Sequence, residues 1–223
     1  MDNYYQSQYS QDKALNEKYF KNKTSGTFLD IGAHDGKTLS NTFFYEKALG
    51  WSGLCIEPHP KVFQQLKENR TCTLVEGCAW HEDTTKIFRM IEGYSEMLSG
   101  LLDSYPEAHL QRVQGEVASM GQVVQDIEMK CYDINKLLIE KGISKVDLLS
   151  IDVEGSELDI LKAIDYDAVD VDVILVENNY NDEDLRDFLR SKGFNFADRL
   201  SIDDVFVNNK FNEDKVQDSS TVL

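Results

Sequence analysis

A strand, a glycine turn, a helix and a second strand that ends in an acid constrain the fold of this chain most strongly. Residues 28–36 read Phe-Leu-Asp-Ile-Gly-Ala-His-Asp-Gly, and residues 53–57 read Gly-Leu-Cys-Ile-Glu. Gly32 and Gly36 permit a tight turn and a close backbone approach, and the helix that follows offers free N–H groups. A strand-end acid such as Glu57 can accept hydrogen bonds from both hydroxyls of a ribose. The pattern predicts a nucleotide-cofactor site on a parallel sheet.

The spacing of the glycines distinguishes between two nucleotide cofactors. It reads Asp-x-Gly-x-x-x-Gly, whereas Gly-x-Gly-x-x-Gly brings a pyrophosphate onto a helix N-terminus. The observed spacing favours S-adenosylmethionine over NAD, because S-adenosylmethionine has no phosphate and has an ammonium group that needs a carboxylate. Asp30 lies at the strand end, where it could bind that group directly or through water. His34 could contact the cofactor, approach the substrate or merely hydrogen-bond the backbone.

The rest of the chain alternates short apolar segments with segments of helical spacing. We expect strands at residues 73–79, 86–91, 145–152, 169–177, 194–200 and 204–207, and helices at residues 38–49, 61–69, 156–163 and 182–192. This is the βαβ rhythm of a parallel sheet. The chain has 223 residues, is 41% hydrophobic and shows no tract that resembles a linker. We therefore expect one α/β domain, residues 1–223, in which a doubly wound sheet is covered by helices on both faces.

Two segments depart from this rhythm. Residues 92–125 form a long polar insertion with apolar anchors, and loops of this length are usually functional or disordered. We expect a partly helical flap over the site, with disorder as the alternative. The tail, residues 208–223, is mostly polar and is expected to be flexible.

Charge and cysteine content limit the partners and the location. A net charge of −17 repels phosphate backbones and acidic lipids, so we expect neither nucleic acid nor a membrane as a partner. No segment approaches the roughly 20 apolar residues of a membrane helix, and the start lacks the basic and apolar run of a secretory signal. The four cysteines lack the spacing of a zinc site. We expect reduced thiols in a cytoplasmic protein.

Acidic residues gather at the ends of two later strands. Residues 151–157 read Ile-Asp-Val-Glu-Gly-Ser-Glu, which places Asp152 and Glu154 after one strand, and Glu177 with Asn178 ends the next. Asp152, Glu177 and Asn178 would provide three oxygen ligands for Mg²⁺, which could orient a hydroxyl and lower its pKa. The alternative is that the acids cap the helix that follows or contact the cofactor alone.

Two other side chains are candidates with a strong structural alternative. Trp80 could stack near the adenine of the cofactor, although a large aromatic residue at a strand end more often packs against the core. His109 is relevant only if the insertion folds over the site.

Five motifs together resemble the FkbM family of methyltransferases. They are residues 7–12 (Ser-Gln-Tyr-Ser-Gln-Asp), 28–36, 56–58 (Ile-Glu-Pro), 94–100 (Tyr-Ser-Glu-Met-Leu-Ser-Gly) and 151–157. The resemblance implies a Rossmann-like class I methyltransferase fold with a seven-stranded, mostly parallel sheet, and methyl transfer, commonly to a hydroxyl of a sugar or natural product. It also implies that residues 1–26 close the cofactor pocket. The expected cofactor-binding residues are Gln8, Gln11, Asp30, Gly32, His34, Gly36, Glu57, Pro58, Ala79, Trp80 and Asp152.

The pairing of Asp152 with Glu177 and Asn178 also resembles the metal site of Mg²⁺-dependent sugar and catechol O-methyltransferases. The histidine or lysine base that follows the strand-four acid in such enzymes is absent, since a Gly-Ser pair follows Glu154. Either Glu154 or a residue of the insertion removes the proton, or the metal makes a strong base unnecessary.

We therefore expect an S-adenosylmethionine-dependent O-methyltransferase in which Asp152, Glu154 and Glu177 are catalytic. The expected partner is a sugar, glycan or small-molecule hydroxyl acceptor, with Mg²⁺ as a second candidate cofactor. A scaffold or sensor that binds the cofactor without turnover is the alternative. An NAD-dependent oxidoreductase is disfavoured, because the third glycine and a hydride-transfer pair are missing. An apolar patch on the insertion could pair subunits in an oligomer or receive substrate.

Overall fold

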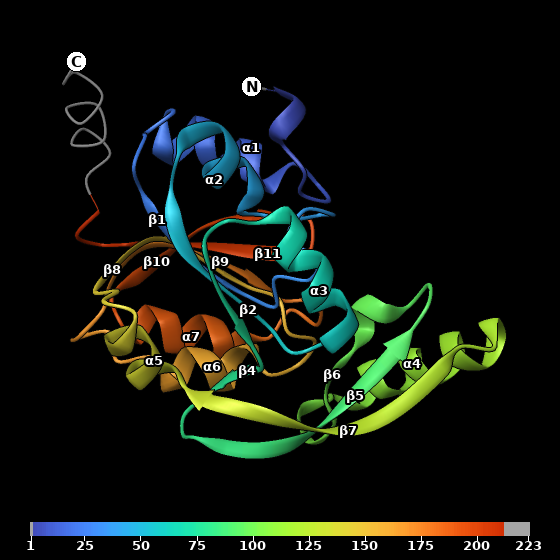
Figure 1. Ribbon diagram of the computed structural model, residues 1–223. Helices are drawn as coiled ribbons and strands as arrows, with labels where there is room; N and C mark the ends of the chain where they lie inside the picture. Colours follow the sequence, from blue (N-terminus) through green and yellow to red (C-terminus); the bar gives the residue numbers. More distant parts are fainter. Residues whose placement is uncertain (1, 212–223) are drawn as a thin grey trace.

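The computed structural model describes residues 2–211, and its main feature is a seven-stranded sheet with the order β10-β11-β9-β8-β1-β2-β3 (Figure 1). β11 runs antiparallel to β9 and β10, whereas the other neighbouring strands are parallel. The strands are β1 (Thr27–Ile31), β2 (Ser52–Glu57), β3 (Thr73–Glu76), β8 (Lys145–Ile151), β9 (Asp170–Glu177), β10 (Phe194–Leu200) and β11 (Asp203–Asn208). This confirms the predicted Rossmann-like, mostly parallel sheet with a hairpin at its C-terminal end.

The central strands are apolar because both of their faces are covered. Every residue of β8 after Lys145 is buried, as expected for a strand inside a parallel sheet. Leu149 of β8 lies beside Leu29 of β1 and Ile174 of β9. From β1 the chain proceeds to β2 and β3 on one side, and later strands continue on the other. The strand order therefore reverses between β1 and β8, which leaves a crevice at their carboxyl ends.

Helices cover both faces of the sheet, as predicted (Figure 1). One face packs against α1 (Gln11–Leu15), a π-helical turn (Asn16–Phe20), α2 (Phe43–Leu49) and α3 (Pro60–Asn69), and the other packs against α5 (Ile134–Glu140), α6 (Glu157–Ala163) and α7 (Glu183–Ser191). A short 3₁₀ turn (Asp2–Tyr4) precedes α1. Alternate strand residues serve the two layers: Phe28 and Leu148 belong to the first, Leu29 and Leu149 to the second.

A smaller sheet with the order β4-β7-β5-β6 extends from this body (Figure 1). Its strands are β4 (Cys78–Trp80), β5 (Thr84–Glu92), β6 (Gly100–Leu101) and β7 (Val123–Asp133). β5 and β7 form a long antiparallel ribbon. Two 3₁₀ turns (Glu96–Leu98 and Leu102–Ser104) and α4 (Glu107–Met120) connect them and lie within the predicted insertion. The ribbon and α4 project together from the seven-stranded sheet.

The helix predicted at residues 38–49 begins only at Phe43, so this prediction is wrong over its first five residues. Oδ1 of Asp35 accepts hydrogen bonds from the N–H groups of Lys37 and Thr38, at 2.8 and 2.6 Å. In a helix these N–H groups would donate to backbone carbonyl oxygens. Here the Asp35 carboxylate accepts them instead, as aspartate commonly does in turns. The chain therefore turns before the helix can start.

The second sheet was not predicted as a separate unit. The single strand expected at residues 73–79 is β3 and β4, which belong to different sheets and are divided at Gly77, where φ is 144°. β7 and α5 were also missed. β7 alternates apolar with charged residues and is only partly buried, so it lacks the continuous apolar run of the central strands.

The predicted tail begins at the residue where the last strand ends. β11 ends at Asn208, and residues 212–223 of that tail lie outside the described residues. Within residues 2–211, no helix combines the length and the apolar character needed to span a membrane. The four cysteines are free.

Candidate active site

A cavity of about 320 Å³ opens at the carboxyl ends of β1, β2, β8 and β9, where the strand order reverses. Open α/β sheets bind their ligands at this position, and small-molecule sites usually have volumes of about 300–1,000 Å³. The predicted residues that line it are Gln8, Gln11, Asp30, Gly32, His34, Glu57, Pro58, Ala79, Asp152, Glu154 and Glu177. Most of the predicted site thus gathers around one cavity, and Gly36, Trp80 and Asn178 do not line it.

The turn after β1 approaches β8 so closely that only glycine fits. Gly32 has φ +83°, and a Cβ atom there would lie 1.7 Å from the carbonyl oxygen of Asp152. Its N–H donates to the carbonyl of Ile56 at 3.0 Å, which ties the turn to β2. Gly36 has φ +75°, but it packs against the side chain of Arg70. Gly36 therefore supports the turn from the side away from the cavity, and its predicted contact with the cofactor stays a prediction.

Glu57, the last residue of β2, faces the cavity with a carboxylate that backbone groups hold in place. Oε2 accepts a hydrogen bond from the N–H of His34 at 2.8 Å, and Oε1 accepts one from the N–H of His59 at 2.7 Å. Burial raises the pKa of Glu57 to about 7, although these bonds and the ring of His34 oppose the rise. A carboxylate can accept about four hydrogen bonds. About two acceptor positions therefore remain for ligand hydroxyls.

Asp30 is buried in β1, and its charge is partly matched inside the protein. Oδ2 accepts a hydrogen bond from Oγ1 of Thr42 at 2.5 Å, and Nη1 of Arg70 lies 3.9 Å away. Burial raises the pKa of Asp30, while Arg70 and Thr42 oppose the rise. Arg70 also pairs with Glu46 at 2.5 Å, so its charge is divided between two acids. Asp30 can therefore still bind a cation at the cavity wall.

The N-terminal segment lies against the same cavity. Gln8 and Gln11 line it, and Nε2 of Gln11 donates to Oδ2 of Asp203 at the start of β11. The ring of Tyr5 stacks on Phe44 of α2, with the ring centroids 4.0 Å apart. This contact anchors the segment and places two amide side chains beside the site.

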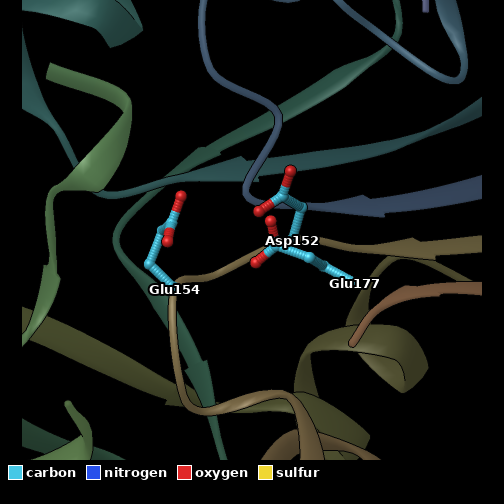
Figure 2. A group of neighbouring side chains, drawn as sticks. All are labelled: Asp152, Glu154 and Glu177. Atoms are coloured by element: carbon cyan, nitrogen blue, oxygen red, sulfur yellow. The ribbon is translucent and has the colours of Figure 1, made fainter. Parts of the chain in front are cut away.

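Three carboxylates converge beyond β8 and β9 (Figure 2). Asp152, Glu154 and Glu177 each offer an oxygen within 4.8 Å of the others. Burial and mutual repulsion raise the pKa of Glu177 to about 11 and raise that of Asp152 well above its usual range. Glu154 has φ +60°, a left-handed conformation that is costly for this residue type and is common at functional sites. Oxygen ligands with unbalanced negative charge fit a hard divalent cation.

Asn178 does not join this cluster. Its Nδ2 donates to Oδ2 of Asp204 at 2.8 Å and to the carbonyl of Asp182 at 3.2 Å, and its Oδ1 accepts from the N–H of Asp182 at 2.6 Å. The amide therefore holds the loop that leads into α7. The acidic cluster thus differs from the predicted ligand set, because it contains Glu154 in place of Asn178.

Trp80 lies in the core of the smaller sheet and not in the cavity. Its buried side chain belongs to the same apolar cluster as Phe88, and Nζ of Lys86 lies 4.1 Å from its ring centroid. Cys78, Ala79 and Phe88 line the cavity, whereas Trp80 does not. The structure therefore supports packing, and not adenine stacking, as the role of Trp80.

The insertion contributes a wall of the cavity. Residues 96–101 line it together with Arg112 of α4. His109 of α4 is buried, with Nδ1 3.2 Å from Oε2 of Glu154 and Nε2 3.2 Å from the carbonyl oxygen of Leu98. The insertion thus folds over the acidic cluster and brings His109 beside it.

Sequence reasoning assigned no site role to several polar residues that line the cavity, among them Asn41, Arg112, Asn179 and Asp203. They come from a turn, a helix, a loop and a hairpin strand. Asn179 had a usable signal, because it directly follows the predicted pair at the end of β9. The other three lie far from any motif, so only the tertiary fold brings them to the site.

Four buried polar atoms of this lining have no hydrogen-bond partner in the described part of the chain. They are Nδ1 and Nε2 of His34, Oδ1 of Asn41 and Oε2 of Glu154. Two of them still lie near a group that can carry the opposite charge: Nε2 of His34 is 3.3 Å from Oε1 of Glu96, and Oε2 of Glu154 is 3.2 Å from Nδ1 of His109. An unpaired buried polar group costs about 1–3 kcal/mol. This arrangement fits a polar ligand that supplies the missing donors and acceptors.

A family model and a solved structure are similar to this chain. A family model described as the Methyltransferase FkbM domain matches residues 30–196, which contain the last two residues of β1 and the acidic cluster. The chain belongs to the FkbM methyltransferase family. A methyltransferase FkbM from Methylobacillus flagellatus KT is a similar solved structure, with a TM-score of 0.49 and 15% identity. The match covers 82% of this chain and 44% of that chain, so this chain spans less than half of that relative. A search of curated proteins gave no match.

The candidate site extends beyond the region that the family model matches. The family match begins at Asp30 and ends at Phe196, so it leaves out Gln8, Gln11 and Asp203. The structure nevertheless places all three at the cavity. Both ends of the described chain therefore contribute side chains to the site that the family core forms.

Proposed function

We propose that this FkbM methyltransferase is S-adenosylmethionine-dependent and methylates a hydroxyl group of a sugar, a glycan or a small natural product. One observation carries the proposal: Glu57, with its open acceptor positions, and the cluster of Asp152, Glu154 and Glu177 line one cavity. The part of the cavity around Glu57 would bind a methyl donor that contains a ribose. The cluster suits activation of an oxygen nucleophile.

The residues around Glu57 fit S-adenosylmethionine. The two ribose hydroxyls match the acceptor positions that the N–H groups leave open, and His34, whose ring nitrogens make no hydrogen bond, lines the same cavity. Asp30 would attract the ammonium group, and the amides of Gln8 and Gln11 would hold the carboxylate end. When bound, this cofactor supplies a methyl group on a sulfonium, which an oxygen nucleophile can attack.

The acidic cluster would hold a divalent cation such as Mg²⁺ through Asp152, Glu154 and Glu177. A bound cation would orient the acceptor hydroxyl and lower its pKa. It would also relieve the repulsion that raises the pKa of Glu177. Without a cation, Oε2 of Glu154, which makes no hydrogen bond and lies 3.2 Å from Nδ1 of His109, would take the hydroxyl proton as a general base. Alignment of the hydroxyl with the donor at about 3–3.5 Å would contribute several kcal/mol of rate enhancement.

Calorimetry with the pure protein tests the donor half of this proposal. S-adenosylmethionine would be titrated with and without Mg²⁺, and release of S-adenosylhomocysteine would then be followed with a panel of sugars. Mg²⁺-dependent release supports both the reaction and the metal site. Binding without release from any acceptor favours a cofactor-binding scaffold or sensor. No binding under either condition contradicts the proposal.

A further inference from the structure

A second cavity, of about 350 Å³, adjoins the acidic cluster. Glu154, Glu177 and Asn179 line both this cavity and the first one. Its other walls are the insertion, at Pro106 and His109, and the loop between β9 and α7. Methyl transfer requires that donor and acceptor meet. An acceptor in the second cavity would meet a donor in the first at the three shared residues.

The second cavity is strongly acidic. Its lining contains four acidic side chains, those of Glu154, Glu157, Glu177 and Asp182, and among the described residues it contains no lysine or arginine. Glu177, whose pKa is about 11, holds a proton at pH 7 unless a cation binds, so the negative charge of the wall comes from the other acids. Arg112 lines only the first cavity, and its Nε donates to Glu116 at 3.0 Å. A divalent cation held by Asp152, Glu154 and Glu177 would not contact Glu157 or Asp182, because neither belongs to that cluster. The cavity therefore retains negative charge on its acceptor side.

The side chain of Glu154 indicates that a ligand binds in this cavity. It is only 10% exposed, and Oε2 has no hydrogen-bond partner although Nδ1 of His109 lies 3.2 Å away. In the same lining, the ring of Tyr180 is 49% exposed. A ring of this kind can cover the apolar face of a small molecule or attract a cation. A cationic N–H donor on a compact body would satisfy both groups.

We propose that the second cavity is the acceptor site and that it prefers a hydroxyl compound with a protonated amine, such as an amino sugar, over one with a carboxylate. This inference rests on the proposed function, because it assigns the acceptor of that reaction. An ammonium group would make charge-assisted hydrogen bonds with the acidic wall. A carboxylate of the same size would be repelled by the wall and by the net charge of −17.

Three sugars of one ring size test the preference: D-glucosamine, D-glucose and D-glucuronate. Their binding to the full chain loaded with S-adenosylhomocysteine would be measured by ligand-detected NMR at about pH 7, where the amine is largely protonated. Glucosamine should bind about fivefold more tightly than glucose, and glucuronate more weakly than either. Added salt should weaken glucosamine binding and leave glucose binding unchanged.

Asp182→Asn removes one charge from the wall and preserves the fold, since asparagine also serves as the N-cap that Asp182 provides for α7. It should reduce the preference for glucosamine over glucose by about half or more. The matched control is Asp184→Asn, which removes a charge from the same helical turn at an exposed position outside the lining. It should leave the preference unchanged.

Three outcomes would overturn the inference: glucuronate binds as well as glucosamine, Asp182→Asn behaves like its control, or none of the sugars binds. Calorimetry with S-adenosylmethionine separates these outcomes from failure of the proposed function. If the donor binds and the sugar preference is absent, the acceptor inference alone is wrong. If the donor does not bind, the methyl-transfer proposal itself is contradicted.

Discussion

The carboxylate of Glu57 is held by two backbone N–H groups and keeps acceptor positions open to the cavity. Glu57→Gln keeps the size of the side chain but replaces one charged oxygen with an NH₂ donor. Hydrogen bonds to charged groups contribute about 1.5–3 kcal/mol. We therefore expect S-adenosylmethionine binding to weaken by about ten- to hundredfold, as measured by calorimetry.

The matched control for this substitution is Glu76→Gln. Glu76 lies beside Glu57 on the neighbouring strand β3, but it is exposed and does not line the cavity. Its substitution should leave the dissociation constant unchanged. Equal effects of the two substitutions would show that Glu57 does not contact the donor.

Glu154 combines a left-handed backbone conformation with repulsion from two neighbouring carboxylates. Glu154→Gly removes both costs, so we expect the free energy of unfolding to rise by about 1 kcal/mol. Loss of a catalytic base or metal ligand should lower the methyl-transfer rate by about 10²–10⁴-fold. Denaturant unfolding and release of S-adenosylhomocysteine measure the two effects. Opposite signs for stability and activity are expected of a strained functional residue.

The control for the backbone effect is Ser201→Gly. Ser201 has φ +64° in the exposed turn between β10 and β11, away from the cluster. It should gain less stability than Glu154→Gly, because no charge repulsion is relieved, and it should keep its activity. A Glu154→Gly protein that is no more stable than the Ser201→Gly protein would argue against repulsion in the cluster.

At the scale of elements, the insertion provides a matched pair of glycines. A Cβ atom at Gly100 would lie 2.6 Å from Cε1 of Tyr105, whose hydroxyl donates to the carbonyl of Leu98 at 2.6 Å. Gly100→Ala should therefore displace the wall of the first cavity and destabilise the protein by about 1–3 kcal/mol. Gly115 lies in α4 with open space around it, so Gly115→Ala should stabilise by about 0.5–1 kcal/mol.

Urea unfolding of the two alanine variants, with calorimetry of donor binding, checks this pair. Only Gly100→Ala should weaken donor binding, since only Gly100 lines the cavity. If both substitutions stabilise the protein, the contact between Gly100 and Tyr105 is looser than the structure indicates.

The elements that could be predicted from the sequence are those with a clear local pattern of apolar and turn residues. β8 and β9 are continuous apolar runs bounded by turns, so both were recognised with their bounds nearly correct. β7 was missed because its alternating charged residues suit a half-exposed strand, and its paired residues in β5 lie 31 to 47 positions earlier in the sequence. Strand pairing over such a separation in sequence depends on the tertiary fold and cannot be predicted from a local sequence pattern.

The candidate site shows the same division between local and tertiary information. Strand-end acids such as Glu57 and Glu177 were predictable, because parallel strands deliver their carboxyl ends to one edge. Asn178 adjoins Glu177 in sequence, yet its amide binds Asp204 of a strand that is antiparallel to β9. The direction of a side chain at a strand end depends on that packing, which the sequence does not show.

For the whole molecule, stability and cofactor binding are coupled through the buried charge of Glu57. Burial raises its pKa from 4.5 to about 7, so the folded protein holds a proton that the unfolded chain has released between these pH values. Stability should therefore fall as the pH rises through this window, by up to about 1.4 kcal/mol per pH unit. Asp203, whose pKa burial raises to about 6, contributes with the same sign.

Ligand hydroxyls that donate to Glu57 favour its charged form and should recover part of the stability lost at higher pH. We expect S-adenosylmethionine to raise the melting temperature more at about pH 8 than at about pH 5.5, because only the charged carboxylate accepts two further hydrogen bonds. Glu57→Gln should abolish this difference between the two pH values, whereas Glu76→Gln should keep it. Thermal unfolding with and without the donor, at saturating concentration, measures both effects. A melting shift that is independent of pH in the native protein would mean that the donor does not use the carboxylate, and that the raised pKa of Glu57 reflects burial alone.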